Sequence, residues 1–219
     1  MSDAIPSTIG IVILMSVIGL VPLIVVTMTG FLKISVVMFL VRNALGVQQT
    51  PPNLVLYGIA LILTVYVTSP LLSDIYSRLS ARPLQLRSVE DLTEAAKTVR
   101  QPIQAHLARF TQPNERQFFL SATTRIWPES ARADVKDDDL VVLLPAFVGS
   151  ELTRAFEIGF LLYLPFLVID LVVANVLMAL GMIMVSPTLI SVPLKLFLFV
   201  AVSGWSRLMH GLILSYGSP

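Results

Sequence analysis

The chain of 219 residues contains no cysteine and only two histidines, His106 and His210. Without cysteine it can form neither a disulfide framework nor a thiolate metal site. Two isolated histidines also argue against a transition-metal centre, which takes several nitrogen or sulfur ligands. Charged residues make up only 13% of the sequence, the net charge is +1, and no basic run is present. The composition therefore gives no reason to expect a metal, a cofactor or a nucleic-acid partner.

Motifs of the common enzyme classes are absent as well. The sequence has no HExxH, no GxSxG and no glycine-rich phosphate loop, so it offers no zinc-protease site, nucleophile elbow or nucleotide cradle. We therefore expect a protein without enzymatic activity. The first positive charge is Lys33, so the N-terminal apolar run lacks the basic opening of a secretory signal peptide. We expect that run to be retained in the mature protein.

Hydrophobic residues dominate what is present, at 55% of the chain. Twenty of the charged residues, ten of each sign, lie between Asp74 and Asp139. This distribution predicts an all-α protein that passes a membrane several times. Its expected parts are an N-terminal apolar helical hairpin (1–73), a small soluble helical insert (74–139) and a C-terminal apolar helical hairpin (140–219).

The N-terminal hairpin is predicted from two apolar runs. Ile5–Leu32 carries no charge and continues apolar to Val41, which predicts one long, bent helix that contains Lys33. We expect Lys33 to snorkel to the membrane interface, with contact to a ligand as the alternative. The second span, Leu54–Leu72, is expected to end near Pro70.

The short connector 42–53 is bracketed by Lys33 and Arg42, whereas the charges of the insert balance. Because the positive-inside rule counts short loops, the connector is assigned to the cytoplasm and the 74–139 insert to the far side of the membrane. Within the insert, Pro102 is expected to break a helix, leaving further helices over Ile103–Phe110 and Asn114–Ile126.

Two acidic features of the chain are interpreted structurally. The run Asp137-Asp138-Asp139 lacks the spacing and glycine of a calcium loop, so we interpret it as a solvated helix start. Glu151, Arg154 and Glu157 follow one another at three-residue steps. That spacing predicts charges near one helical face, pairing along the helix or with a neighbouring subunit. A catalytic role for the carboxylates is disfavoured because no nucleophile or histidine is nearby.

The C-terminal hairpin organises the chain. Its first leg, Ile158–Val185, has a single charge, Asp170, and turns at Gly181–Pro187. The returning leg, Leu189–Val202, is interrupted by Pro193 and Lys195. An Asp170–Lys195 ion pair, within the hairpin or between subunits, would neutralise both charges. The rival interpretation is a proton relay through Asp170, because carboxylates at membrane depth often mark ion pathways.

Methionines mark the end of this hairpin. Asp170, Ala174, Met178 and Met182 form a slowly drifting stripe at four-residue steps. The turn beside Gly181 reads Met182-Ile183-Met184. Because methionine is flexible and polarizable, a ring of such turns from several subunits could seal a hole and yield around a passing polypeptide.

A series of motifs in both apolar halves now points to a known family: Phe31-Leu32-Lys33-Ile34, 42–46 with Gln48-Gln49, Pro51-Pro52-Asn53, 144–147 with Ser150-Glu151-Leu152, 155–160, 165–170, and Gly181-Met182 through Ser186-Pro187. Together they resemble the FliP/SctR family of type III export-apparatus proteins, which includes YscR, HrcR and SpaP. The insert matches only in placement and charge.

The resemblance implies a pore-forming subunit of the export gate in the bacterial inner membrane, which passes unfolded proteins. Family members form a helical assembly of five copies, with a small two-helix subunit, a larger subunit and a switch or autoprotease subunit as partners. Much of that assembly lies above the membrane plane. Met182, Ile183 and Met184 take the positions of the channel gasket, although the family commonly has three methionines and Ile183 departs from this. Flagellar members typically carry a cleaved signal peptide, so the injectisome branch is favoured over the flagellar counterpart.

Two other function classes remain as alternatives to an export-gate subunit. A small-solute or ion transporter acting through Asp170 should show repeated halves with paired broken helices, and the two halves do not repeat. An intramembrane enzyme is disfavoured by the missing motifs described above.

Overall fold

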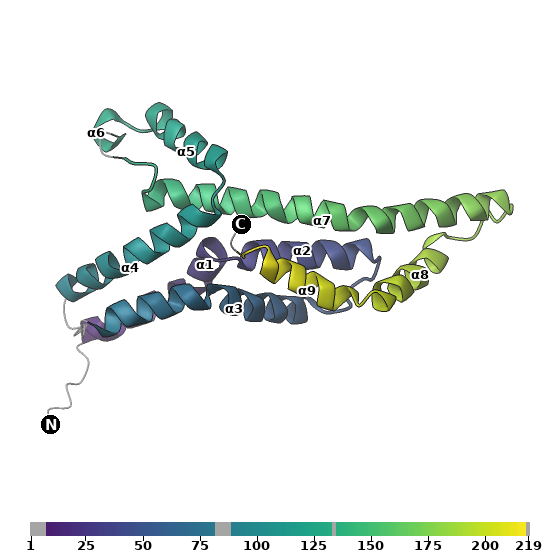
Figure 1. Cartoon of the computed structure of the whole chain (residues 1–219), viewed down its shortest axis with the longest axis horizontal. Helices are drawn as coiled ribbons and strands as arrows, with labels where there is room; N and C mark the ends of the chain where they lie inside the picture. Colours follow the sequence, from purple (N-terminus) through teal and green to yellow (C-terminus); the bar gives the residue numbers. More distant parts are fainter. Residues whose placement is uncertain (1–7, 82–88, 133–134, 218–219) are drawn as a thin grey trace, which may run out of the picture. The chain divides into compact units, whose positions relative to one another are not determined.

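A computed structural model of the chain describes residues 8–81, 89–132 and 135–217. All regular secondary structure in these ranges is helical (Figure 1), so the expected all-α class is confirmed. The helices run in this order: α1 Thr8–Met28, α2 Phe31–Ala44, α3 Asn53–Ser80, α4 Val89–Phe110, α5 Pro113–Ile126, α6 Glu129–Arg132, α7 Leu140–Ala179, α8 Thr188–Ala201 and α9 Gly204–Leu214.

The chain forms two compact units, and each takes two separate stretches of sequence. Unit 1 comprises the residues up to Gly30 together with Thr68–Glu151, and unit 2 comprises Phe31–Val67 together with Leu152–Pro219. The long helices α3 and α7 therefore contribute residues to both units. The three-part division at residues 73 and 139 remains a prediction about how the chain is distributed across a membrane.

Among the residues that the structure describes, two helices are long and apolar enough to cross a membrane, α3 and α7. The number rises to four if each of two bent pairs, α1 with α2 and α8 with α9, makes one span. The single bent helix expected through Lys33 is instead two helices separated at Thr29-Gly30. Glycine favours such a break because it gains little from the helical conformation. Lys33 lies in the first turn of α2.

Proline does not end the helices where the sequence suggested. The second apolar helix continues past Pro70 to Ser80, and α4 continues through Pro102. A proline inside a helix removes one backbone hydrogen bond and costs about 3 kcal/mol. On α4, contacts on both sides of Pro102 offset part of this cost: Arg100 pairs with Asp139 at 2.7 Å, and the Gln104 amide donates to the Asp138 carbonyl at 2.7 Å.

The acidic run before α7 is therefore a set of tertiary contacts rather than a solvated helix start alone. Besides the Arg100–Asp139 pair, Asp137 forms an ion pair with Arg116 of α5 at 3.4 Å. The backbone N–H of Gln112, just before α5, donates to the Ser150 hydroxyl on α7 at 2.8 Å. These contacts join α4, α5 and the first turns of α7 within unit 1.

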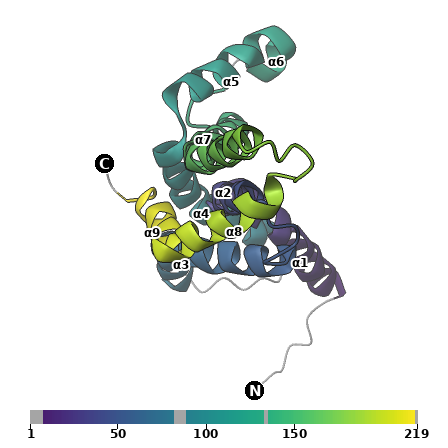
Figure 2. The ribbon, with the colours of Figure 1, turned by 90° about the vertical axis from the view of Figure 1, so that its right-hand side faces the viewer.

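Unit 2 is built around α2. Half of this 14-residue helix is buried, at Lys33, Ile34, Ser35, Val37, Met38, Val41 and Ala44. Figures 1 and 2 place α2 between α7 on one side and α9 on the other. Gly159 permits the close approach of α7, because a Cβ at this position would overlap the Leu40 side chain of α2.

The return leg of the hairpin forms α8, which runs through Pro193, and a further helix follows that the sequence analysis did not predict. A bend of 62° separates α8 from α9, and Ser203 adopts a left-handed conformation there, with φ of 55°. The Phe199 and Trp205 rings meet edge to face across the bend, 5.3 Å apart. A side chain at Gly204 would overlap Phe199, so the bend requires a glycine at this position.

His106 titrates in a partly apolar site on α4. Its ring lies 5.1 Å from Phe110 and 6.4 Å from Phe147. Burial, and secondarily the positive charge of Arg109, lower the pKa of His106 below 6.5. The folded chain therefore binds this proton less readily than the unfolded chain. The resulting stability is complete above the unfolded pKa and is lost as the pH falls through the lowered folded pKa.

We predict that thermal unfolding of the detergent-solubilised protein, followed by circular dichroism, shifts to lower temperature between about pH 7 and about pH 5. His106→Phe keeps the ring contacts and cannot be protonated, so it should flatten this part of the pH dependence. His210→Phe controls for the loss of a histidine elsewhere. A slope that His106→Phe leaves unchanged would assign the pH dependence to other groups.

Candidate functional site: the α7–α8 hairpin

An ion pair between a buried ammonium and a partly exposed carboxylate joins the two legs of the hairpin. The Lys195 ammonium on α8 donates to the Asp170 carboxylate on α7 at 2.5 Å, and also to the backbone carbonyl of Ala44 at 3.1 Å. Lys195 is 4% exposed, whereas the Asp170 side chain is 36% exposed. The pair that the sequence favoured is therefore formed within one chain.

Ala44 is the last residue of α2, and this gives its contact with Lys195 a second role. The last carbonyls of a helix lack intrahelical partners and carry the negative end of the helix dipole. The ammonium therefore meets a carboxylate and a helix C-terminus at once. The sequence carried no signal for this contact, because the acceptor is a backbone atom distant in sequence.

The connector after α2 is held by Arg42. Its guanidinium donates to the Asn53 side chain at 2.6 Å and to the Pro51 carbonyl at 3.1 Å. Gly46 adopts a left-handed conformation, with φ of 75°, and a Cβ there would lie 2.8 Å from the Val192 side chain of α8. The connector therefore packs against α8 at Val192, in the first two turns of that helix.

The tip of the hairpin has a defined backbone. Gly181, with φ of 72°, donates to the Met178 carbonyl at 3.0 Å, and the N–H of Met182 donates to the Leu177 carbonyl at 2.9 Å. These two bonds make a Schellman motif, in which glycine adopts the left-handed conformation at little cost. The hydroxyls of Ser186 and Thr188 then lie 2.7 Å apart at the start of α8.

The side chains of this tip are exposed although its backbone is fixed. Met182 is 43%, Ile183 84% and Met184 100% exposed. Met178, one turn earlier on α7, is 62% exposed. The predicted stripe ends there, because α7 stops at Ala179 and Met182 belongs to the turn. Three apolar side chains therefore project from a hydrogen-bonded turn.

Lys33 does not snorkel, and the structure corrects that expectation. Its side chain is 1% exposed, and Nζ lies 3.5 Å from the centre of the Tyr216 ring. The face of an aromatic ring attracts a cation, most strongly when both are desolvated. Tyr216, which lies near the C-terminus and which the sequence analysis did not single out, is thus part of the environment of Lys33.

The three charges on α7 that were expected near one face lie in different environments. Glu151 is fully buried, Arg154 is half-buried and Glu157 is exposed. Steps of three residues rotate by 300° in a helix of 3.6 residues per turn, so each successive side chain turns about 60° around the axis. Two such steps are enough to carry Glu157 away from the face that holds Glu151.

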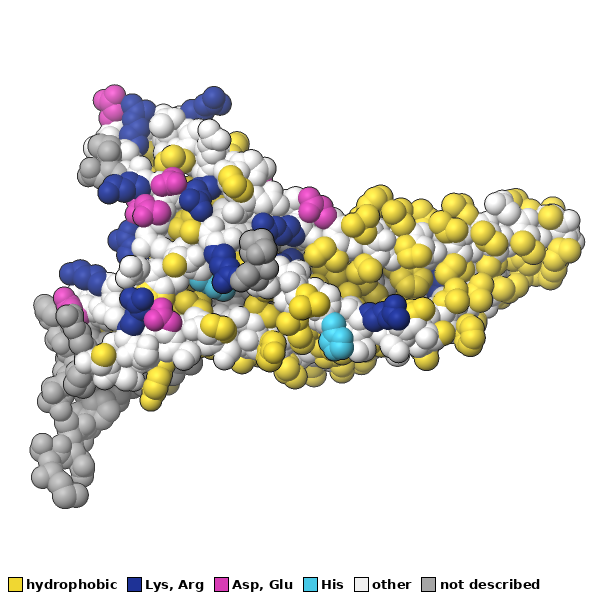
Figure 3. All heavy atoms as spheres, in the orientation of Figure 1, with side chains coloured by type: hydrophobic (Ala, Val, Ile, Leu, Met, Phe, Trp, Pro, Cys, Tyr) yellow, Lys and Arg dark blue, Asp and Glu magenta, His cyan; other side chains and the backbone are white. Residues whose placement is uncertain are grey.

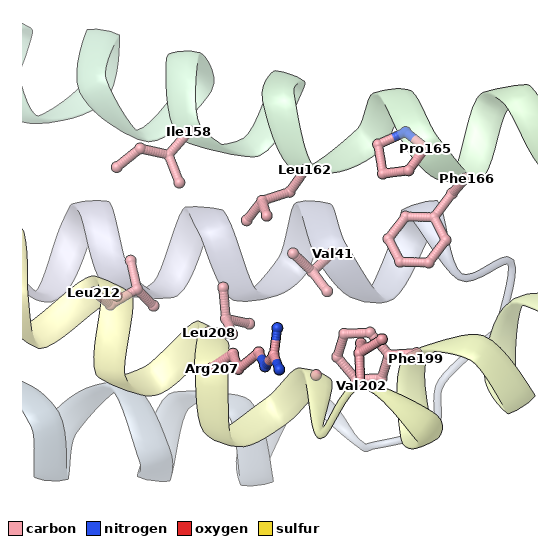
Figure 4. A pocket seen from close by; sticks show the side chains of 12 residues that line it. Val41, Ile158, Leu162, Pro165, Phe166, Phe199, Val202, Arg207, Leu208 and Leu212 are labelled. Carbon is pink, nitrogen blue, oxygen red and sulfur yellow. The ribbon is translucent and has the colours of Figure 1, made fainter.

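An apolar groove lies between α7 and α9. It has a volume of about 410 Å³ and is lined on α7 by Ile158 and Leu162 and on α9 by Leu208 and Leu212, with Val41 of α2 as its floor. Arg207 is the one charged residue in its lining, and Figure 4 shows this side chain across the groove from Leu162.

Most of the surface formed by this hairpin is apolar. Figure 3 shows hydrophobic side chains over the far ends of α7 and α8, with few charges among them. Large side chains such as Phe160, Leu171, Leu189 and Phe197 are 56% to 72% exposed. Monomeric soluble proteins rarely expose contiguous apolar areas of this extent, so the surface requires lipid or protein cover.

The fold and the hairpin define a class before any relative is compared: an all-helical, membrane-type protein whose apolar surface needs cover and whose hairpin projects a fixed apolar tip. The sequence comparisons identify the family. The FliP family model matches residues 14–212, and the chain belongs to the FliP family.

Individual relatives give the branch of the family. The chain is 56% identical over 219 residues to "Probable translocation protein y4yL" of Sinorhizobium fredii, covering 100% of this chain and 99% of that protein. It is 48% identical over 212 residues to "Yop proteins translocation protein R" of Yersinia pestis, covering 97% and 98%. It is also 48% identical over 198 residues to "Harpin secretion protein HrpW" of Pseudomonas syringae, covering 90% and 95%. The resemblance to injectisome proteins of type III secretion is therefore confirmed.

The ion pair generates a prediction about stability. Asp170→Ala leaves the buried Lys195 ammonium with the Ala44 carbonyl alone and should cost about 3–5 kcal/mol, as expected when one partner of a buried pair is removed. Adding Lys195→Met removes the second charge and should recover much of that loss. Denaturant unfolding in detergent measures both changes.

A surface pair provides the matched control. Asp74 pairs with Arg78 at 2.9 Å, and both side chains are at least 40% exposed, so Asp74→Ala should cost less than about 1 kcal/mol. If the Asp170→Ala/Lys195→Met variant were as unstable as Asp170→Ala, the pairing of the two charges would not be what stabilises the hairpin.

Proposed function

We propose that this protein is a pore-forming subunit of the type III secretion export gate and passes unfolded proteins across the bacterial inner membrane. The observation that carries the proposal is the hairpin tip, where Met182, Ile183 and Met184 project from a backbone-fixed turn. The names of the injectisome relatives, which refer to translocation and secretion, support it.

In this proposal the tips of several copies meet around the channel axis and close it. Methionine has a flexible, polarizable side chain that packs against irregular surfaces, so a collar of methionines can yield around polypeptides of any sequence. Ile183 is branched at Cβ and has a restricted χ1. We therefore assign compliance to Met182 and Met184, and assign a stiffer part of the seal to Ile183.

The apolar surface of the protein supports assembly with other export components. We propose five copies of this chain together with a small two-helix subunit, a larger subunit and a switch or autoprotease subunit. The short connector held by Arg42 would lie on the cytoplasmic side, and the 74–139 insert in the periplasm, as the balance of charges in the short loops favours.

The gate proposal predicts a leak. Replacing both Met182 and Met184 with Ala shortens the side chains of the collar, so a closed, assembled complex should conduct small ions while its composition stays unchanged. Single-channel recording on the purified complex in planar bilayers measures the conductance, and native mass measurement checks assembly.

Leu189→Ala is the control, because Leu189 is 72% exposed and lies just beyond the tip on α8. It should leave the complex closed. Conductance that does not change in the double methionine variant would count against a gasket at this turn.

A proton relay through Asp170 is the second candidate, since this carboxylate is partly exposed within an otherwise apolar leg. Its bond to Lys195 favours a structural role instead, because the buried Lys195 ammonium depends on this carboxylate as its charged partner. Asp170→Asn keeps the side-chain shape and one acceptor oxygen. We predict that secretion and assembly fall together in this variant. Lost secretion from a normally assembled complex would favour the relay.

A further inference from the structure

Unit 2 holds two charges that its own contacts leave unpaired. Its only carboxylate side chains are Asp170 and Glu157, and Asp170 is bonded to Lys195. Glu157 on α7 and Arg207 on α9 are both exposed. Within the part of the chain that the structure describes, neither forms an ion pair. A lone charge is costly wherever protein or lipid covers the surface around it.

Both charges lie among apolar side chains. Arg207 lies at a groove, and Glu157 lies on a projecting ridge whose shape is complementary to such a groove. Arg207 lies at the groove between α7 and α9, whose other lining residues are apolar or glycine. Glu157 lies on a ridge along the exposed face of α7, beside Phe156 and Phe160, which are 55% and 63% exposed. Positions i and i+4 of a helix lie on one face, so the two phenylalanines can enter a groove together, as anchors of helix-in-groove binding do.

The ridge and the groove are formed by the same turns of α7. Ile158 and Leu162, which line the groove, occupy the same turns of the helix as Glu157 and Phe160 but face another side. Figure 4 shows Arg207 opposite Leu162. A second copy placed beside the first, with little shift along α7, would bring its ridge to the groove.

We propose that Glu157 of one copy pairs with Arg207 of the next copy, with Phe156 and Phe160 seated in the α7–α9 groove. The inference deepens the proposed function and rests on it, since it names the surfaces by which copies of this chain meet. Because ridge and groove are different surfaces of one unit, the contact is heterologous. Such a contact repeats from copy to copy and produces a ring or a helical arrangement rather than an isolated pair.

The absence of cysteine from the chain permits a clean test. A chain carrying Glu157→Cys and one tag is co-expressed with a chain carrying Arg207→Cys and a second tag, together with the export components. After oxidation we expect a disulfide-linked dimer that contains both tags and disappears on reduction. Gln48→Cys, at an exposed position on the connector, replaces Arg207→Cys in the control and should give no dimer.

Charge reversal provides a second measurement. Glu157→Arg, and separately Arg207→Glu, should reduce recovery of one tagged copy with the other by about tenfold, because like charges then face each other in the contact. A chain with both reversals restores opposite charges and should recover the association.

The outcomes separate this contact from the wider proposal. If differently tagged copies without substitutions do not co-purify, self-assembly and the proposed function fail together. If they co-purify but neither the disulfide nor the restoration by double reversal appears, this contact is wrong and the function stands. Anionic phospholipid that co-purifies and is lost in Arg207→Glu, without any disulfide, would assign the groove to lipid and overturn the proposal.

Discussion

Lys195 donates to the Asp170 carboxylate and to the Ala44 carbonyl, so one buried ammonium joins α2, α7 and α8. The legs of this hairpin are otherwise almost entirely apolar, and apolar side chains pack with little preference for register. The Lys195 ammonium is different, because its residue is only 4% exposed. A shift of α8 along α7 would leave this charge without partners in a medium of low dielectric. This interaction therefore helps to fix the position of α8 along α7.

The tip depends on a second constraint at the other end of the same hairpin. The Schellman bonds around Gly181 fix where α7 stops and how the chain turns. The ion pair fixes the two legs of the hairpin and the turn fixes its tip, so the backbone between them has little conformational freedom. The side chain of Met184 is nevertheless fully exposed. The backbone of the tip is thus fixed while its side chains are free, and the seal proposed above would need both properties to close again after each passage.

Much of this hairpin was predictable because its determinants are local or paired by simple spacing: the turn glycine, the two lone charges and the apolar legs. The helix ends predicted at Pro70 and Pro102 were wrong. A proline inside a helix costs about 3 kcal/mol, and it ends the helix only when other contacts do not offset that cost. At Pro102, contacts from Asp138 and Asp139 lie 36 or more residues away in sequence. The burial of Lys33 against Tyr216 escaped for the same reason, since a ring near the end of the chain covers a charge near its start.

The exposed apolar surface along α7 is longer than the hydrocarbon core of a membrane is thick. At 1.5 Å per residue, the 40 residues of α7 extend about 60 Å, whereas the hydrocarbon core of a membrane is about 30 Å thick. Large apolar side chains remain exposed from Leu152 to Leu180, which is still about 40 Å. An upright helix would therefore leave part of this surface outside the hydrocarbon core. In that orientation protein would cover the remainder, and for this reason the unpaired Glu157 on α7 points to a contact with a neighbouring chain.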